Sequence, residues 1–175
     1  MRRRSVIAWA ALPGALLLAR PTAAALPAGY DPIVVQPTRD GERAEFDLRP
    51  ALARARAEGK RLYVYLGASD CPYCRKYERF LAANLAALKP HFGPYLVVDL
   101  RSALSIQADR LFLRAGERAL AFVPFQQSIG DERTRLVYPS VWLLDAGGRP
   151  LMQMPAGTGT FETVPEQLEI LRLEQ

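Results

Sequence analysis

The chain has 175 residues, half of them hydrophobic, with 23 basic and 18 acidic side chains. Residues 1–25 hold four arginines and no acidic residue, so the remaining chain is almost neutral. Such a chain is long enough for one domain with its own core. Its charge gives no reason to expect a nucleic acid or an anionic membrane as the partner.

Residues 1–25 have the order of a secretory signal peptide: arginines at 2–4, an apolar run over 6–19 and small residues at 22–25. The apolar run is short for a membrane span, which needs about 20 residues, so a cleaved leader is favoured over a retained anchor. We expect a periplasmic protein with no stable membrane insertion after cleavage. The general secretory route is the default, and the paired arginines are also compatible with a twin-arginine route.

Residues 26–45 are interrupted by proline and glycine, which predicts an extended lead-in. Within it, Ile33–Val35 is apolar and β-branched, and it predicts an edge strand. Asp47 is a candidate N-cap for a helix over 48–58, and Gly59 is its expected end.

The only two cysteines of the chain follow the next apolar segment, which predicts a strand over 61–66. They are spaced C-x-x-C as Cys71-Pro72-Tyr73-Cys74, at the start of a helix predicted to run to about residue 88. A helix N-terminus favours a thiolate at the first cysteine, and proline is compatible with the first turn. One turn later, Cys74 faces the same side and can close a disulfide with Cys71.

The region between the next strand, at 95–100, and a strand at 141–144 is longer than a compact domain of this kind usually needs. We interpret residues 101–137 as an inserted helix and loop, with the helix at 106–115. Three apolar side chains of the insertion are expected either to form a cap that faces substrate or to cover one sheet edge: Phe122, Phe125 and Ile129. The chain then predicts a turn, a returning strand and a final helix, at 145–148, 149–154 and 161–173.

The strand, C-x-x-C and helix resemble the active site of the thioredoxin superfamily, and the Pro72-Tyr73 dipeptide is typical of glutaredoxins. The flanking segments 59–61 and 67–69 look more like exported bacterial thioredoxin-like proteins, which include the periplasmic domain of the transmembrane disulfide reductase. The resemblance implies an α/β thioredoxin-like fold over residues 46–175, with a mixed central sheet flanked by helices and a helical or loop insertion before the strand that follows a cis proline.

The resemblance also implies the roles of the cysteines. Cys71 would be the nucleophile that attacks a disulfide, and Cys74 the thiol that resolves the mixed disulfide. The alternatives are an inert pair, a structural disulfide or a zinc site. Two cysteines and the single His91 do not supply four zinc ligands at a familiar spacing, so we expect neither a metal nor an organic cofactor.

Tyr138-Pro139 precedes the strand at 141–144, where the resemblance implies a cis peptide bond whose preceding backbone pairs with an extended substrate. The alternative is an ordinary trans proline opening a strand. The Tyr138 ring would then contact or crowd the substrate. Tyr73, between the cysteines, is either exposed for partner contact or half-buried on the helix.

Two residues depart from the thioredoxin pattern. Tyr65 occupies the position of a buried aspartate that helps to move protons from the resolving thiol. Because tyrosine accepts protons poorly near neutral pH, either water or another acid would serve, or resolution of the mixed disulfide would be slower. Asp70 stands where thioredoxins have tryptophan, and we interpret it as a solvated turn residue.

We therefore expect a periplasmic thiol–disulfide oxidoreductase that exchanges disulfides with protein substrates and has a membrane redox partner. The reductase direction is slightly favoured over the oxidase direction. A glutathione-dependent enzyme is a second reading, disfavoured because no glutathione-binding pattern is evident. A third reading is a thioredoxin-fold binding or assembly module in which Cys71 and Cys74 regulate docking, and the long insertion is the feature in its favour.

Overall fold

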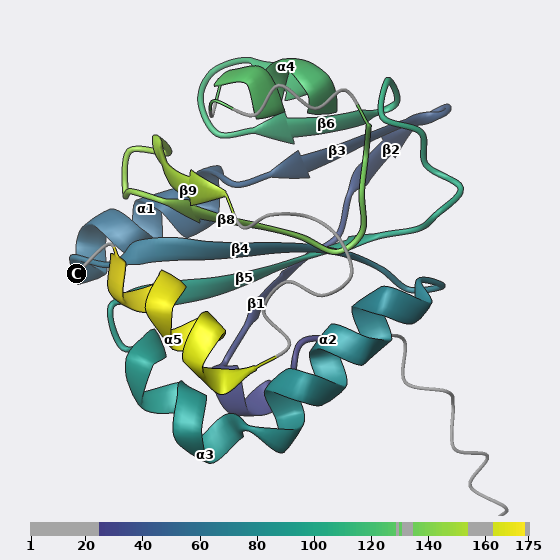
Figure 1. Cartoon of the computed structure of the whole chain (residues 1–175). Helices are drawn as coiled ribbons and strands as arrows, with labels where there is room; N and C mark the ends of the chain where they lie inside the picture. Colours follow the sequence, from purple (N-terminus) through teal and green to yellow (C-terminus); the bar gives the residue numbers. More distant parts are fainter. Residues whose placement is uncertain (1–24, 129, 131–134, 154–162, 174–175) are drawn as a thin grey trace, which may run out of the picture.

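The computed structural model describes residues 25–128, 130, 135–153 and 163–173 (Figure 1). The predicted leader lies outside these residues, apart from Ala25. The described elements, in chain order, are η1 (Ala28–Tyr30), β1 (Ile33–Val35), β2 (Thr38–Asp40), β3 (Arg43–Asp47), α1 (Arg49–Glu58), β4 (Arg61–Ala68), α2 (Pro72–Ala83), α3 (Leu85–Leu88), η2 (Lys89–Phe92), β5 (Tyr95–Ser102), β6 (Leu111–Arg114), β7 (Ala119–Ala121), α4 (Phe122–Ser128), β8 (Ser140–Leu144), β9 (Pro150–Gln153) and α5 (Val164–Leu173). No helix within the described ranges is both long and apolar enough to cross a membrane.

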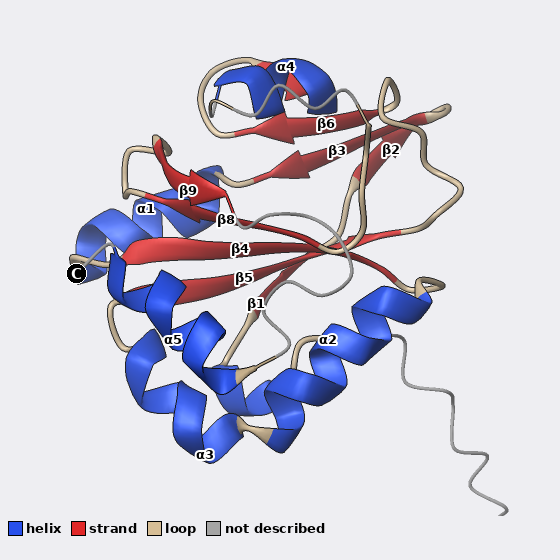
Figure 2. Cartoon of the chain, in the orientation of Figure 1, coloured by secondary structure: helices blue, strands red, loops and turns tan. Residues whose placement is uncertain are grey.

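The central sheet has five described strands in the order β1-β5-β4-β8-β9 (Figure 2). The strands β1, β5 and β4 are parallel to one another, β8 pairs antiparallel to β4, and β9 pairs antiparallel to β8. Helices cover the sheet, which confirms the predicted α/β fold class and its mixed sheet. The predicted edge strand at Ile33–Val35 is also confirmed, because β1 pairs only with β5 within the described chain.

A second sheet, in the order β2-β3-β6-β7, was not predicted. It joins the lead-in to the insertion, because β3 pairs in parallel with β6. The helix expected at 106–115 is therefore wrong. Leu111 and Leu113 are buried while Phe112 and Arg114 are only partly so, which is the alternation of a half-buried strand.

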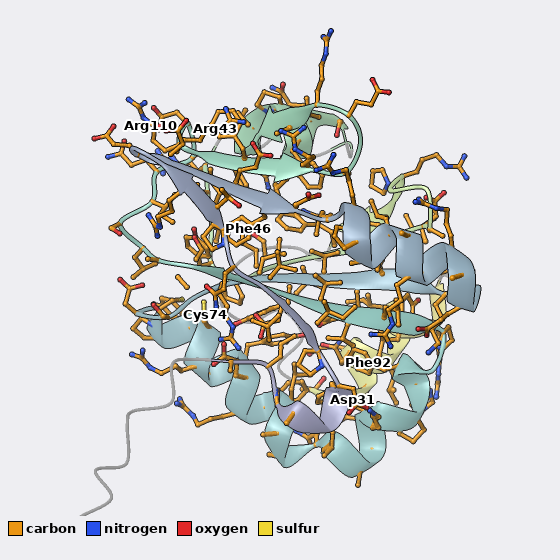
Figure 3. All side chains as sticks on the ribbon, turned by 180° about the vertical axis from the view of Figure 1, so that it is seen from behind. Asp31, Arg43, Phe46, Cys74, Phe92 and Arg110 are labelled. Atoms are coloured by element: carbon orange, nitrogen blue, oxygen red, sulfur yellow. The ribbon has the colours of Figure 1, made fainter. Side chains whose placement is uncertain are left out.

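The two faces of the central sheet have separate cores. One core lies between the central sheet and the second sheet, with α1 and α4 at its borders, and Phe46 of β3 points into it (Figure 3). Phe122 and Phe125 of the insertion pack against Trp142, with ring centroids 6.2 and 5.3 Å apart. These two side chains therefore cover the sheet rather than form a cap facing substrate, while Ile129 lies outside the described residues.

The other core lies between the central sheet and the helices α2, α3 and α5. The single helix expected from residue 71 to 88 is interrupted at Asn84, which ends α2 and begins α3. The Asn84 side-chain amide donates to the carbonyl of Phe80 at 2.8 Å, a local bond that competes with regular helix hydrogen bonding.

The remaining helix ends follow the sequence closely. The helix α1 starts one residue later than expected, with Leu48 at the N-cap position, and Asp47 accepts a hydrogen bond from the Arg49 N–H at 3.0 Å. It ends at Gly59, whose φ of 63° is the left-handed conformation that favours glycine. The predicted turn after β8 is present, and Asp145 accepts hydrogen bonds from the Gly147 and Arg149 N–H groups, both at 2.8 Å.

Candidate active site

The cysteine pair lies where the central strand β4 passes into α2. The strand is buried along almost its whole length, so its end is held rigidly inside the protein. Cys71 is the N-cap of α2 in an extended conformation, and Pro72 opens the helix. The Cys71 sulfur accepts a hydrogen bond from the Cys74 N–H at 3.1 Å. A sulfur at this position takes the place of a capping oxygen.

The two thiols differ in their surroundings. Cys74 is fully buried, and its sulfur accepts the Ala68 N–H at 3.5 Å. Burial raises the pKa of the Cys74 thiol, with the adjacent Cys71 sulfur adding to the effect. Cys71 is also a free thiol, and its residue is 2 % exposed. Cys71 therefore lies at the terminus of α2, whereas the buried Cys74 needs a base to remove its proton.

The loop before β8 closes over this pair. The Tyr138–Pro139 peptide bond is cis, as the resemblance implied. The Cys71 thiol donates to the Tyr138 carbonyl at 3.8 Å, and Tyr138 packs against the small cluster formed by Ala68 and the two cysteines. The Tyr138 hydroxyl shares a 2.6 Å hydrogen bond with Ser102 at the end of β5. Burial raises the pKa of Tyr138 to about 12, so this hydroxyl stays neutral.

Tyr65, which replaces the expected aspartate, is hydrogen-bonded to a buried acid. Its hydroxyl donates to Glu78 at 2.8 Å. Glu78 lies one helical turn after Cys74 on the same face of α2, and its residue is only 7 % exposed. Burial raises the pKa of the Glu78 carboxyl. The Tyr65 side chain also interacts favourably with the Cys74 sulfur, which lowers the pKa of the thiol and partly offsets the effect of burial. The tyrosine therefore connects the buried thiol to a buried carboxyl.

Gly67 makes room for this tyrosine. The Tyr65 ring folds along β4 over Gly67, and a Cβ added at residue 67 would lie 2.5 Å from a ring carbon and 2.7 Å from the hydroxyl oxygen. Only glycine leaves that space free. The backbone of β4 thus orients the tyrosine hydroxyl toward the end of the strand that carries the cysteines.

The rim of the site is partly apolar. Tyr73 is 57 % exposed, which agrees with the exposed reading of this residue, and Leu104 is 49 % exposed. Asp70 is an exposed turn residue that accepts the Leu104 N–H at 2.9 Å, so it ties the loop after β5 to the cysteine turn. Arg75 donates to the Ser69 carbonyl at 3.4 Å.

His91 lies in η2, beyond α3 and at the opposite end of this helical stretch from Cys71. Within the described ranges, no group of three or more histidine, cysteine, aspartate or glutamate side chains is arranged to hold a metal ion.

Sequence reasoning did not find Glu78 or Ser102. An acid on a helix is usually solvent-exposed, so Glu78 attracts no notice by itself. The available signal was its spacing: it falls four residues after Cys74 and three before Leu81, on the face that had to be buried. Ser102 carried no comparable signal, because its partner Tyr138 lies far along the chain.

The sequence also matches a known protein family. A family model described as a thioredoxin-like domain matches residues 48–170. Among solved structures, the chain is similar to a thioredoxin-fold protein from Helicobacter pylori, with 12 % sequence identity and a TM-score of 0.39; the match covers 66 % of this chain and 82 % of that protein. No curated protein matches the sequence significantly. The family match spans most of the chain, including both cysteines and the cis proline, and the chain belongs to the thioredoxin-like domain family.

Proposed function

We propose that the protein is a periplasmic thiol–disulfide oxidoreductase that exchanges disulfides with protein substrates through Cys71 and Cys74. The observation that carries the proposal is the position of the Cys71 sulfur. It caps α2, accepts the Cys74 N–H at 3.1 Å and lies beside the Tyr138 carbonyl. Membership of the thioredoxin-like domain family supports an activity of this type.

In the reductive direction, the Cys71 thiolate attacks one sulfur of a substrate disulfide. The substrate S–S bond breaks, a mixed disulfide forms, and the other substrate sulfur leaves as a thiolate. The Cys74 thiolate then attacks the Cys71 sulfur, which forms the Cys71–Cys74 disulfide and releases the second substrate sulfur. Two electrons pass to the substrate, and the oxidative direction is the reverse.

The second step needs a base, because burial raises the pKa of the Cys74 thiol. Glu78 is the base that we assign. As Cys74 attacks, its proton passes to the Tyr65 hydroxyl while the tyrosine proton passes to Glu78 across the 2.8 Å hydrogen bond. Burial raises the pKa of Tyr65 well above its usual value, so the tyrosine relays a proton without ionising. The raised pKa of Glu78 makes it a stronger base than an exposed carboxylate.

The substrate would lie along the Tyr138-Pro139 backbone, with Tyr73 in contact at the exposed rim. Ser102 fixes the Tyr138 ring through a 2.6 Å hydrogen bond, so the ring is held beside the substrate path. The reductase direction and a membrane electron donor follow from the resemblance to exported reductive domains. The binding-module reading loses its main support, because Phe122 and Phe125 of the insertion are buried in the core.

Two experiments test this function. Equilibration of the cysteine pair with thiol buffers gives its reduction potential: about −270 mV supports a reductase and about −120 mV an oxidase, while a pair that does not exchange overturns the enzyme. In the second, Cys74→Ala should accumulate mixed disulfides with periplasmic proteins, and Cys71→Ala should accumulate none. If both variants instead bind the same partner proteins equally well, the protein docks to its partners without turnover.

A further inference from the structure

A second buried carboxyl lies near the site and has an unusual partner. Asp99 of β5 is fully buried. Its Oδ2 atom accepts a hydrogen bond from the backbone N–H of Leu26 at 3.0 Å and pairs with the Arg101 guanidinium at 2.6 Å. The Oδ1 atom of Asp99 is buried and has no hydrogen-bond partner among the described residues. A carboxylate in this position is one donor short.

The partner N–H belongs to Leu26, the first residue after the predicted leader. Leu26 is 4 % exposed, while Ala25 before it is exposed. The chain thus reaches the surface between these two residues, directly after the small residues 22–25 that predict the cleavage point. Hydrolysis of the Ala25–Leu26 bond adds one water: Ala25 keeps a carboxylate, and Leu26 gains an amine that is protonated at neutral pH.

We propose that this cleavage creates a structural ion pair, in which the new α-ammonium group of Leu26 binds the buried Asp99 carboxylate beside the cysteine site. The uncleaved amide offers Asp99 one N–H, whereas an ammonium group offers three. A second N–H is then available for the unpartnered Oδ1 atom.

The charges around Asp99 also favour an ammonium group. The ionisable groups that face it are Arg101 on β5, Glu78 on α2 and Tyr65 on β4. Arg101 pairs directly with Asp99 and acts on the Glu78 carboxyl only through its charge. Burial raises the pKa of both Asp99 and Glu78, the sign of charges that lack full compensation. A second cation at Leu26 would balance the second carboxylate.

The first test is the mass of the protein purified from the periplasm after expression of the full chain with its leader. The proposal requires a mature chain that begins at Leu26. A chain that begins at any other residue, or an uncleaved chain, would overturn it.

The second test compares thermal unfolding of three chains: one that begins at Leu26, the same chain with an acetylated amine, and one that retains Ala24-Ala25. An α-amino group has a usual pKa of about 7.7–8.0, and pairing with a carboxylate raises it. The ion pair therefore stabilises the fold below about pH 8 and is lost as pH rises through the raised value. We expect the Leu26 chain to melt several degrees above the other two at pH 7, and the gap to close at pH 10.

Asp99→Asn should abolish this gap, while Asp31→Asn, at an exposed carboxyl of the same segment that pairs with Lys89, should preserve it. If Asp99→Asn does not fold, the acetylated chain gives the same comparison. It keeps Asp99 and one N–H at Leu26, but its α-amino group carries no charge. A gap that is absent at pH 7, or that does not change with pH, would refute the ion pair. None of these readouts depends on disulfide exchange, so they stand apart from the proposed function.

Discussion

The two faces of the central sheet are covered in different ways. The core under the second sheet is built from aliphatic and large aromatic side chains around Trp142. The core under α2, α3 and α5 contains tyrosines joined by hydrogen bonds: Tyr63 shares a hydrogen bond with Tyr77, which donates to Gln167 at 2.8 Å. At the end of this tyrosine-rich core lie Cys74, Tyr65 and Glu78.

The difference suggests that one face of the sheet provides stability and the other holds the reactive groups in position. Apolar burial under the second sheet supplies stability without directional requirements. The helix side holds polar groups that are costly when buried unpaired, so their hydrogen bonds fix their positions. Figure 3 shows the separation, with Phe46 between the sheets and Cys74 on the helix side. Substitutions under the second sheet should therefore change stability, and those on the helix side should change chemistry.

The largest effect is expected from Phe46→Ala, which empties a fully buried site under the second sheet. We expect a loss of about 3–5 kcal/mol in the free energy of unfolding, measured with urea. Molecules that remain folded should exchange disulfides at the unchanged rate. Leu120→Ala, at a 40 % exposed residue of the same sheet, is the control and should cost little. A lower rate of disulfide exchange per folded molecule would show that the core under the second sheet also affects the chemistry.

Glu78→Gln should slow the resolving step by about 100-fold at pH 7, the usual contribution of a positioned base, and leave the first attack by Cys71 unchanged. In the native protein the step should accelerate as pH rises through the raised pKa of Glu78. In the variant it should accelerate only at higher pH, where Cys74 itself ionises. Rapid-mixing measurement of the lifetime of the mixed disulfide checks this.

The control for this prediction is Glu169→Gln, at an exposed acid of α5, which should leave both steps unchanged. Tyr65→Phe should slow the resolving step in the same way. An unaltered lifetime and pH profile in Glu78→Gln would show that water, and not this carboxyl, takes the Cys74 proton.

Gly67→Ala should destabilise the protein by about 1–3 kcal/mol, because the new methyl group meets the Tyr65 ring. Displacement of the ring should also slow the resolving step. The control is Gly116→Ala, where a Cβ meets nothing within 4 Å and no positive φ is involved. An unchanged melting temperature in Gly67→Ala would contradict the prediction.

Ser102→Ala removes the partner of the Tyr138 hydroxyl and should cost about 1 kcal/mol of stability. The clearer effect is expected on KM for a protein substrate, because the Tyr138 ring is no longer held beside the substrate path. Steady-state reduction of a peptide disulfide separates KM from kcat. An altered kcat with an unchanged KM would instead assign Ser102 to the chemical step.

The smallest effect is expected from Arg54→Ala on the exposed surface of α1. Arg54 pairs with Glu58 at 2.6 Å across one helical turn, and such exposed pairs contribute about 0.3–0.5 kcal/mol. Urea unfolding at low and high salt should show a small difference that salt removes. A loss of more than about 1 kcal/mol would mean that surface charge contributes more than is typical of exposed pairs.

The sequence predicted those parts of the fold that are encoded locally. The apolar strand before Cys71, the proline-opened helix and the turn after β8 each follow from a few adjacent residues. The strand β6 does not, because its leucines also suit a helix and only its pairing with β3 selects the strand. The break at Asn84 was missed because one asparagine in a long apolar pattern is a weak signal.

The same distinction applies to the site. Cys71, Cys74 and the cis proline were expected from motif and resemblance. The connection from Cys74 to Glu78 was not, because it depends on the direction of the Tyr65 ring over Gly67. Asp99 is the only charged residue of the strand predicted at 95–100, but its partner Leu26 is 73 residues away in the sequence.

The parallel pairing of β3 with β6 has a consequence for how this chain can be shortened or recombined. The lead-in and the insertion are two pieces of one sheet, although the whole β4–β5 region separates them in the sequence. Removal of either piece alone would leave the other with an uncovered strand edge, which is a template for aggregation. A trimmed version of this protein should therefore lose both pieces together or neither, and a graft of the insertion into a relative should carry the lead-in with it.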